Sequence, residues 1–287
     1  MKQNTPEWLE MRKNYIGASD APIIMGTCKF KLNDGRLKTP YLLWQEKLGL
    51  AQLNSNNYAT EFGKQNESIA LKVYEDMVKD CFAPTVVFHK DIRYMMASLD
   101  GLNVTQDYAV EIKCANKEDH SEAILGKVPK HYYPQVQHQL AVLNINELDY
   151  FSFHKGEGVI VKVKKDNAYL DDLYEKEEKF WKCVEELSEP QLTDGDYVQR
   201  GRHWEECALK LWEIKQQKKA IEREEKELEK QLKEFSEGLN SSSGSFRFGY
   251  HMRKGTVDYK SIPELKNVDL ESYRKKPTQS WRLTQCD

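Results

Sequence analysis

The sequence predicts an α/β protein of the α+β kind, with a mixed central sheet flanked by helices. Two observations carry this prediction. Through the first two thirds of the chain, β-like runs alternate with stretches of helical periodicity, and these runs come as a group of three followed by a pair. Hydrophobic residues make up 39% and charged residues 31% of the 287 residues, the balance of an ordinary globular protein. At this length we expect one core domain and an appendage.

The N-terminal region predicts two helices separated by a turn. The first helix begins near Glu7, and Gly17 marks the turn. The second helix ends near Ile24 and is capped by Ser19 or Asp20.

A longer helix is expected at residues 60–78, followed by short strands at 85–89, 93–99 and 108–114, with a turn at Asp100-Gly101. We expect these strands to be consecutive and antiparallel, and the helix to pack against their sheet. Its apolar face is predicted to hold Phe62, Ile69, Val73 and Met77.

The second half of the core domain continues the same alternation. A buried helix at residues 132–143 leads into two strands at 149–154 and 159–164, and an amphipathic helix follows at 169–187. Residues 194–201 are the expected joint with the rest of the chain.

A highly charged helix is predicted at residues 202–235. Its apolar residues recur seven apart, and Lys218 and Glu225 interrupt the neighbouring row. This pattern favours a helical hairpin arm or a modest oligomer contact over a long coiled coil. The row consists of Ile214, Ile221, Leu228 and Phe235, with Leu211 and Leu232 beside it.

The C-terminal end combines a linker with β-like pieces. Residues 239–245, LNSSSGS, predict a flexible linker, and residues 246–287 add β-like pieces and the basic cluster Arg274–Lys276. We therefore expect three parts, a core domain at 1–200, a charged helical arm at 201–240, and a linker with a small β-containing segment at 241–287.

Composition excludes several classes of protein. No run approaches the roughly 18 apolar residues of a membrane helix, and the start lacks a signal peptide's apolar core, so we expect no membrane association and a cytoplasmic location. The six cysteines form no C-x-x-C pair, which argues against zinc or iron–sulfur ligation. The net charge of −3 does not exclude a nuclease, and the more acidic front half is suited to bound cations.

The residues suited to chemistry lie in SLDG, residues 98–101, and VEIKC, residues 110–114. Residues two apart in a strand point to the same face, so Glu111 and Lys113 project together while Ile112 faces the hydrophobic side. Asp100, expected at the end of the preceding strand, can meet them. Two converging carboxylates suit Mg²⁺, which keeps several waters and needs only one or two protein carboxylates.

An adjacent lysine can stabilise charge on a phosphate undergoing cleavage, or orient and help deprotonate the attacking water. By itself the D…E-x-K pattern is weak, because such residues commonly mark a solvated strand face. Three further motifs accompany it, TPEWLEMRKNYIGASDAPIIMG at 5–26, GKQNE at 63–67 and YYPQVQHQL at 132–140.

With these motifs in this order, residues 8–163 resemble the YqaJ-like viral recombinase family, which includes phage lambda exonuclease and belongs to the restriction-endonuclease-like, PD-(D/E)-x-K superfamily. The resemblance implies that Asp100 and Glu111 hold the metal together with the backbone carbonyl of Ile112. Lys113 matches the catalytic lysine, and Glu67 matches the helix acid that completes the site.

The resemblance also implies the substrate contacts. Arg12, Ser19, Ser98 and Gln135 match residues that surround a terminal 5′-phosphate or support the site. Leu99 departs from the family pattern, where many relatives carry proline, but its side chain is not a ligand.

Each of these residues also has a simpler interpretation. Arg12 can pair with Glu7 or Asp20, although its rigid fork suits a phosphate. Ser19 or Asp20 can be a helix cap, which is compatible with anion binding at a helix N-terminus. Glu67 can pair with Lys64 along its helix.

Helical spacing distinguishes the roles of the glutamines in the helix at 132–143. Gln135 and Gln139 share a face, whereas Gln137 lies nearly opposite. We favour Gln135 for the site and assign Gln137 and Gln139 to packing or backbone contacts. His131 and His138 are left out, because lone histidines near a helix are usually structural or solvent-facing.

The leading interpretation is a DNA exonuclease dependent on Mg²⁺, with Mn²⁺ able to substitute, that removes nucleotides from 5′ ends of double-stranded DNA and leaves 3′ overhangs. The resemblance implies a ring-shaped trimer, a single-strand-annealing recombination protein as partner, and a bacterial or phage-infected cell as the setting. The alternatives are an endonuclease of the same superfamily and a non-catalytic DNA-binding or assembly protein. An iron–sulfur nuclease is a weaker alternative.

Overall fold

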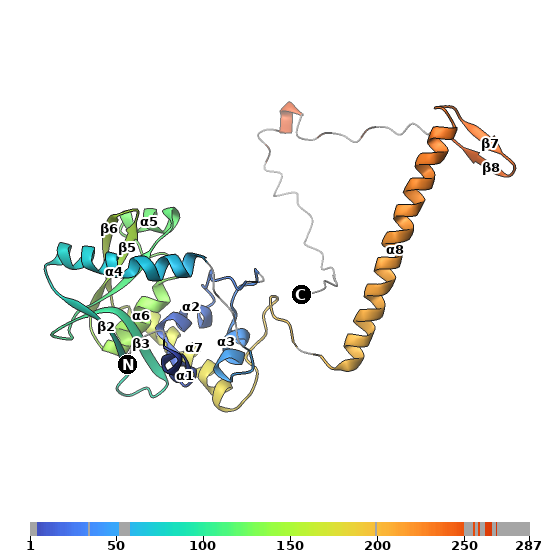
Figure 1. The fold of residues 1–287 in the computed structure, drawn as a ribbon. Helices are drawn as coiled ribbons and strands as arrows, with labels where there is room; N and C mark the ends of the chain where they lie inside the picture. The colour runs from blue at the N-terminus through green and yellow to red at the C-terminus, as the bar shows by residue number, and fades with distance from the viewer. Residues whose placement is uncertain are drawn as a thin grey trace. The chain divides into compact units, whose positions relative to one another are not determined.

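The computed structural model of the protein describes residues 5–33, 35–51, 58–198 and 200–249, together with Gly255, Asp258, residues 262–265 and Val268. At residues 58–65 it describes the backbone but not the side chains. The chain divides into two compact units, residues 1–197 and 198–287, which are treated separately below (Figure 1). Among the helices described, none has both the length and the apolar character needed to cross a membrane.

The first unit contains the predicted helices and strands, with boundaries shifted by a few residues, and three elements that were not predicted, β1, α3 and α5. The helices are α1 (Pro6–Lys13), η1 (Ala18–Asp20), α2 (Ala21–Ile24), α3 (Pro40–Lys47), α4 (Tyr58–Val78), α5 (Lys117–Ile124), α6 (Tyr133–Leu143) and α7 (Asn167–Glu185). The strands are β1 (Ile16–Gly17), β2 (Phe82–Phe88), β3 (Met95–Asn103), β4 (Ala109–Cys114), β5 (Glu147–His154) and β6 (Glu157–Lys164).

Strand β3 organises the sheet because it pairs with three others. β2 runs antiparallel to β3 along its length. β1 pairs in the parallel direction with one end of β3, and β4 pairs in the antiparallel direction with the other end. β5 continues the sheet parallel to β4, and β6 is antiparallel to β5. This mixed sheet with helices on its faces confirms the predicted fold class and the antiparallel meander.

A register shift in the β2–β3 pair changes the role predicted for Asp100-Gly101. Ala83 pairs with Leu102 and Thr85 with Leu99, so Pro84 alone lies opposite Asp100 and Gly101. This is a β-bulge, next to a proline that has no N–H for the ladder. The predicted turn at Asp100-Gly101 is therefore wrong, because β3 continues to Asn103.

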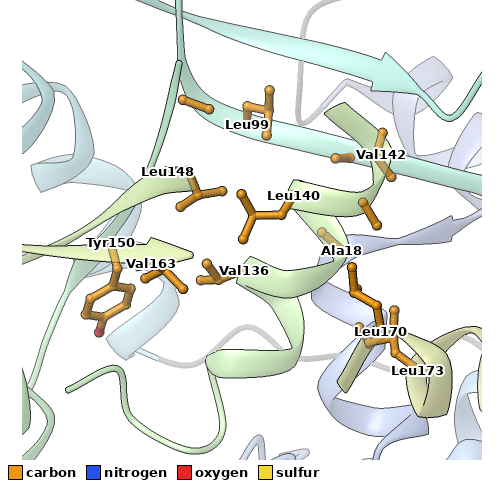
Figure 2. Packing of buried hydrophobic residues seen from close by; sticks show 14 of the residues in the cluster. Ala18, Leu99, Val136, Leu140, Val142, Leu148, Tyr150, Val163, Leu170 and Leu173 are labelled. Carbon is orange, nitrogen blue, oxygen red and sulfur yellow. The ribbon is translucent and has the colours of Figure 1, made fainter. Parts of the chain in front are cut away.

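Helix α6 is the centre of the larger core and covers one face of the sheet. Figure 2 shows Val136 and Leu140 of this helix between the sheet residues Leu99, Leu148 and Val163 on one side and Leu170 and Leu173 of α7 on the other. Because α6 is buried almost all round, every side chain it presents to the sheet is held in place by packing.

Helix α4 covers the opposite face of the sheet through Ala70 and Tyr74, which pack on Val110, Ile112 and Phe151. The apolar face predicted for this helix is wrong in two positions, since Ile69 and Met77 are exposed. Val73 packs partly against this second core, and the side chain of Phe62 lies outside the described residues.

A buried ion pair joins α6 to α7. His138 Nδ1 lies 2.8 Å from Glu177 Oε1, and Nε2 lies 3.0 Å from the Met96 carbonyl oxygen. Both ring nitrogens face acceptors, so the ring is suited to the doubly protonated form. Burial lowers the pKa of His138, but the Glu177 carboxylate outweighs this and the pKa is raised. The structural role expected for His138 is thus what this contact provides.

The second unit contains the predicted long helix, α8 (Arg202–Phe235), and a hairpin of β7 (Ser241–Ser243) and β8 (Phe246–Phe248). The flexible linker predicted at 239–245 is wrong in part, because these residues include β7 and the turn at Gly244, whose φ is +57°. The basic cluster Arg274–Lys276 and the β-like piece at 280–284 lie outside the described residues.

We predict that Glu177→Gln lowers the free energy of unfolding at pH 6 by about 3–5 kcal/mol, because it leaves a buried imidazolium without its counter-charge. The folded pKa of His138 is raised, so the pair stabilises the protein fully below roughly pH 6.5 and this contribution is lost as pH rises through the folded value. Urea unfolding at several pH values should show the difference from wild type shrinking at alkaline pH. Glu178→Gln, on the exposed side of α7, is the matched control, and equal effects of the two changes would contradict the prediction.

Candidate active site

Seven of the residues proposed from the sequence line one cavity of about 140 Å³. The cavity lies where β3, β4, α6 and the N-terminal segment meet. Its lining consists of Trp8, Arg12, Gly17, Ala18, Ser19, Ser98, Asp100, Glu111, Lys113 and Gln135. Glu67 is not among the lining residues.

Asp100 stands at the point where β3 and β4 separate. The two strands pair only through Gly101 with Val110 and Leu102 with Ala109. Beyond these pairs, the Asp100 carboxylate takes the place of a β3 carbonyl and accepts a hydrogen bond from the Ile112 N–H at 2.7 Å. Since the N–H and C=O of one strand residue point the same way, the Ile112 carbonyl also faces this gap.

Glycine is required beside Asp100 because the backbone is crowded there. A Cβ at Gly101 would lie 2.7 Å from Val110 Cγ1 and 2.9 Å from Phe82 Cβ. Any other residue would push β4 or β2 away and move the Asp100 carboxylate with them.

Glu111 is the most enclosed acid of the cavity, with 1% of its surface exposed. Gln135 donates to Oε1 and Gln139 to Oε2, and Lys113 forms an ion pair with Oε1. Gln139 therefore donates to the same carboxylate as Gln135, although we had assigned it to packing or backbone contacts from the sequence. The i,i+4 spacing of the two glutamines was the signal for this.

Burial and neighbouring charges control protonation in the cavity. Burial, and then the neighbouring Glu111 carboxylate, raise the pKa of Asp100 well above its usual range. Burial lowers the pKa of Lys113, but the carboxylates of Glu111 and Asp100 outweigh it and the pKa is raised. Lys113 Nζ also lies 5.1 Å from the centre of the Tyr132 ring. Without a bound cation, Lys113 is therefore a positive charge rather than a base.

The donor set fits a small, hard cation. Asp100 and Glu111 supply carboxylate oxygens to one cavity and Ile112 can add a carbonyl oxygen, which satisfies the modest demand of Mg²⁺ for protein ligands. Glu67, half-buried on α4, is near enough to raise the pKa of Asp100. Within the residues the structure describes, no group of three or more His, Cys, Asp or Glu side chains is arranged to hold a metal, so the predicted three-acid set is not brought together.

Arg12 also lines the cavity, from the N-terminal segment. Its Nη2 donates to Ser19 Oγ at 2.7 Å and Asp20 Oδ1 at 3.2 Å, and its guanidinium lies 4.8 Å from the Trp8 ring centre. Trp8 Nε1 in turn donates to Ser98 Oγ at 3.3 Å. Arg12 therefore forms the predicted pair with Asp20. Because Arg12 also lines the cavity, this pair is compatible with binding a phosphate there.

Asp20 is buried and holds the N-terminal segment together. Its Oδ2 accepts from Gly17 N at 3.0 Å and from Lys47 Nζ at 2.6 Å, and Lys47 also donates to the carbonyls of Arg12 and Tyr15. Burial would raise the pKa of Asp20, but Lys47 and Arg12 outweigh it and the pKa is lowered. Asp20 makes no side-chain cap to α2, but its hydrogen bond from the Gly17 N–H is part of a capping box at the start of η1, so the predicted capping role is met one turn earlier.

Residues 7–146 match the family described as the YqaJ-like viral recombinase domain. This part of the chain, just under half of it, is similar to that family. Protein YqaJ of Bacillus subtilis (strain 168) is 30% identical over 181 residues, which are 61% of this chain and 54% of that protein. The chain thus spans about half the length of this curated relative.

Solved structures share the fold of the YqaJ-like domain. The alkaline exonuclease LHK-Exo from Laribacter hongkongensis matches with a TM-score of 0.53 at 23% identity, covering 63% of this chain and 93% of that one. Its complex with dAMP matches with a TM-score of 0.54 at 24% identity over the same shares. The family resemblance read from the sequence is confirmed, and so is the fold it implied.

Sequence reasoning missed Lys47, which orders the Arg12 side of the YqaJ-like domain from α3. No local pattern marks it, because its partners lie 27 to 35 residues away. By contrast, Gln137 accepts from Asp166 N and donates to the Lys164 carbonyl, the backbone role predicted for it. His131 lies 3.4 Å from Asp119, outside the cavity lining.

We predict that Lys47→Met lowers the free energy of unfolding of the YqaJ-like domain by about 3–5 kcal/mol, because Asp20 stays buried with one of its two cations removed. Urea unfolding at neutral pH measures this loss. Lys179→Met, which breaks an exposed pair with Glu175, should change stability by no more than about 0.5 kcal/mol. A loss for Lys47→Met as small as that of the control would mean that Lys47 does not hold Asp20.

Proposed function

We propose that this protein is a metal-dependent deoxyribonuclease of the phage recombination type, which removes nucleotides from 5′ ends of double-stranded DNA and leaves 3′ overhangs. The observation that carries the proposal is one cavity lined both by two carboxylates and a lysine, Asp100, Glu111 and Lys113, and by an arginine, Arg12. Such a cavity has a place for a cation and a place for phosphate.

Two findings support this choice over a non-catalytic DNA-binding protein. The family is named for viral recombinases, and LHK-Exo, which shares the fold, is an alkaline exonuclease whose structure also exists with dAMP. A binding protein has no need to bury Asp100 beside Glu111, since placing two like charges together is costly unless a cation uses them.

Asp100, Glu111 and the Ile112 carbonyl would hold the metal, which we propose to be Mg²⁺ with Mn²⁺ as a substitute. When bound, such an ion neutralises phosphate charge and acidifies a coordinated water. Lys113, charged and directed by Glu111, would stabilise the negative charge that develops on the phosphate. Gln135 and Gln139 would keep the Glu111 carboxylate in one orientation throughout. Glu67 remains a candidate for a supporting role from α4.

Arg12, Ser19 and Ser98 would bind the terminal 5′-phosphate. The Arg12 guanidinium is already oriented by Asp20 and Trp8, so little side-chain entropy is lost when it binds an anion. The proposed product, a 3′ single strand, implies an annealing protein as partner, and the family resemblance implies a trimer around the duplex in the cytoplasm of a bacterial or phage-infected cell. Both belong to the proposal.

We predict that Asp100→Asn and Lys113→Ala each lower the rate of DNA hydrolysis at least about 100-fold, because each removes charge from the reacting centre. Release of nucleotides from end-labelled linear duplex, with and without Mg²⁺, measures the rate. Binding of the same duplex should be largely retained. Asp172→Asn and Lys179→Ala, both exposed on α7, are the matched controls. Wild-type rates in the two cavity variants would refute the site assignment.

The polarity of cleavage is tested through the DNA end. Linear duplex with 5′-phosphate ends should be degraded from those ends while closed circular DNA survives, and Arg12→Met should reduce the preference for 5′-phosphate over 5′-hydroxyl ends by about tenfold or more, because the forked donor is lost. Nicking of the circle by wild type would favour an endonuclease. An unchanged end preference in Arg12→Met would place the phosphate elsewhere.

A further inference from the structure

Helix α8 presents an apolar face that nothing described in its own unit covers. All 34 residues of the helix are at least partly exposed, and the row Ile214, Ile221, Leu228 and Phe235 is between 54% and 82% exposed. At about 1.5 Å per residue the helix is roughly 50 Å long. The row from Ile214 to Phe235 spans about 32 Å of this length, and a continuous apolar row on one helix face is typical of an interface.

The neighbouring row identifies the occupant. With the first row at the d positions of a heptad repeat, the a positions are Trp204, Leu211, Lys218, Glu225 and Leu232. In a parallel, in-register pair of α8 helices, Lys218 would face Lys218 and Glu225 would face Glu225. Like charges facing each other in an apolar seam are destabilising.

An antiparallel pair of α8 helices brings unlike charges together instead. Lys218 and Glu225 lie at equal distances on either side of the Ile221–Glu222 bond, so a two-fold axis crossing the helix there brings Lys218 of one copy close to Glu225 of the other. Leu211 and Leu232 are related by the same axis. Both charges then have a partner of opposite sign, and both halves of the apolar row are covered.

The flanking positions agree with this direction. In a parallel pair, the e and g positions would place Lys215 beside Lys210 and Glu229 beside Glu224 of the second helix. In an antiparallel pair, e positions meet e positions, so about the same axis Lys215 lies beside Glu229 of the second helix at two places, against one like-charged pair of Glu222 with Glu222. Charge complementarity therefore favours a second copy of this helix, in the antiparallel direction.

We propose that α8 joins two copies of this chain through an antiparallel helix pair centred near Ile221. The contact is separate from the nuclease cavity and does not depend on the proposed activity. In this arrangement the N-terminal ends of the two α8 helices point in opposite directions.

The first test is the mass of the full-length protein in solution, measured by light scattering over a range of concentrations. Ile221→Asp should halve the mass of the assembly at a concentration where wild type is fully associated, and raise its apparent dissociation constant at least about tenfold. Gln216→Asp adds the same charge on the opposite face of α8 and should leave the mass unchanged. Circular dichroism checks that both variants keep the helix. An unchanged mass in Ile221→Asp would overturn the proposal, and the face would then be covered by the chain's own C-terminal residues or by a different protein.

A charge exchange tests the direction. Lys218→Glu and Glu225→Lys should each weaken association, because each creates a like-charged pair across the antiparallel seam, and the double variant should restore it. A parallel pair predicts no such rescue, since like charges face each other in wild type and double variant alike. Failure of the double variant to recover the wild-type mass would overturn the antiparallel arrangement.

Discussion

The separation of β3 from β4 just before Gly101 is the constraint on which the candidate site depends. Two antiparallel strands that stay paired leave no room between them for a charged side chain. Here the bulge opposite Pro84 turns Asp100 into the gap, where its carboxylate satisfies the Ile112 N–H that β3 no longer reaches. The same turn of the backbone brings Asp100 to Glu111, so the acidic wall follows from the strand geometry.

Two buried acids orient the groups that line the cavity, by different means. Glu111 is surrounded by neutral amides and one lysine, which fix the direction of its carboxylate. Asp20 is surrounded by Lys47, Arg12 and a backbone N–H, which fix the N-terminal segment and leave one positive charge in excess there. Each acid is stabilised because its burial comes with full hydrogen bonding, and removing one donor from either leaves charge without a partner.

The sequence was sufficient to predict the position of a side chain where a local periodicity determines it. Alternation in β4 placed Glu111 and Lys113 on one face, and the i,i+4 spacing paired Gln135 with Gln139, although their shared target required the fold. The bulge was mistaken for a turn because Asp-Gly has the same local preference in both, and the difference comes from Pro84 on another strand. The face of α4 was mistaken because large apolar residues were favoured over Ala70, whose small side chain allows close packing on the sheet. Lys47 could not be found, since its contacts are long-range only.

The charges around the cavity explain why a cation and a phosphate belong to one proposal. Asp20, Asp100 and Glu111 oppose Arg12, Lys47 and Lys113, so the six groups balance when all are ionised. The raised pKa of Asp100 shows that full ionisation is unfavourable in the protein alone, because its carboxylate lies beside Glu111 in a buried place. A divalent cation would favour the ionised Asp100 but would leave the cavity with an excess of two positive charges. A phosphate group on the Arg12 side supplies that negative charge, so each of the two ligands lowers the electrostatic cost of binding the other.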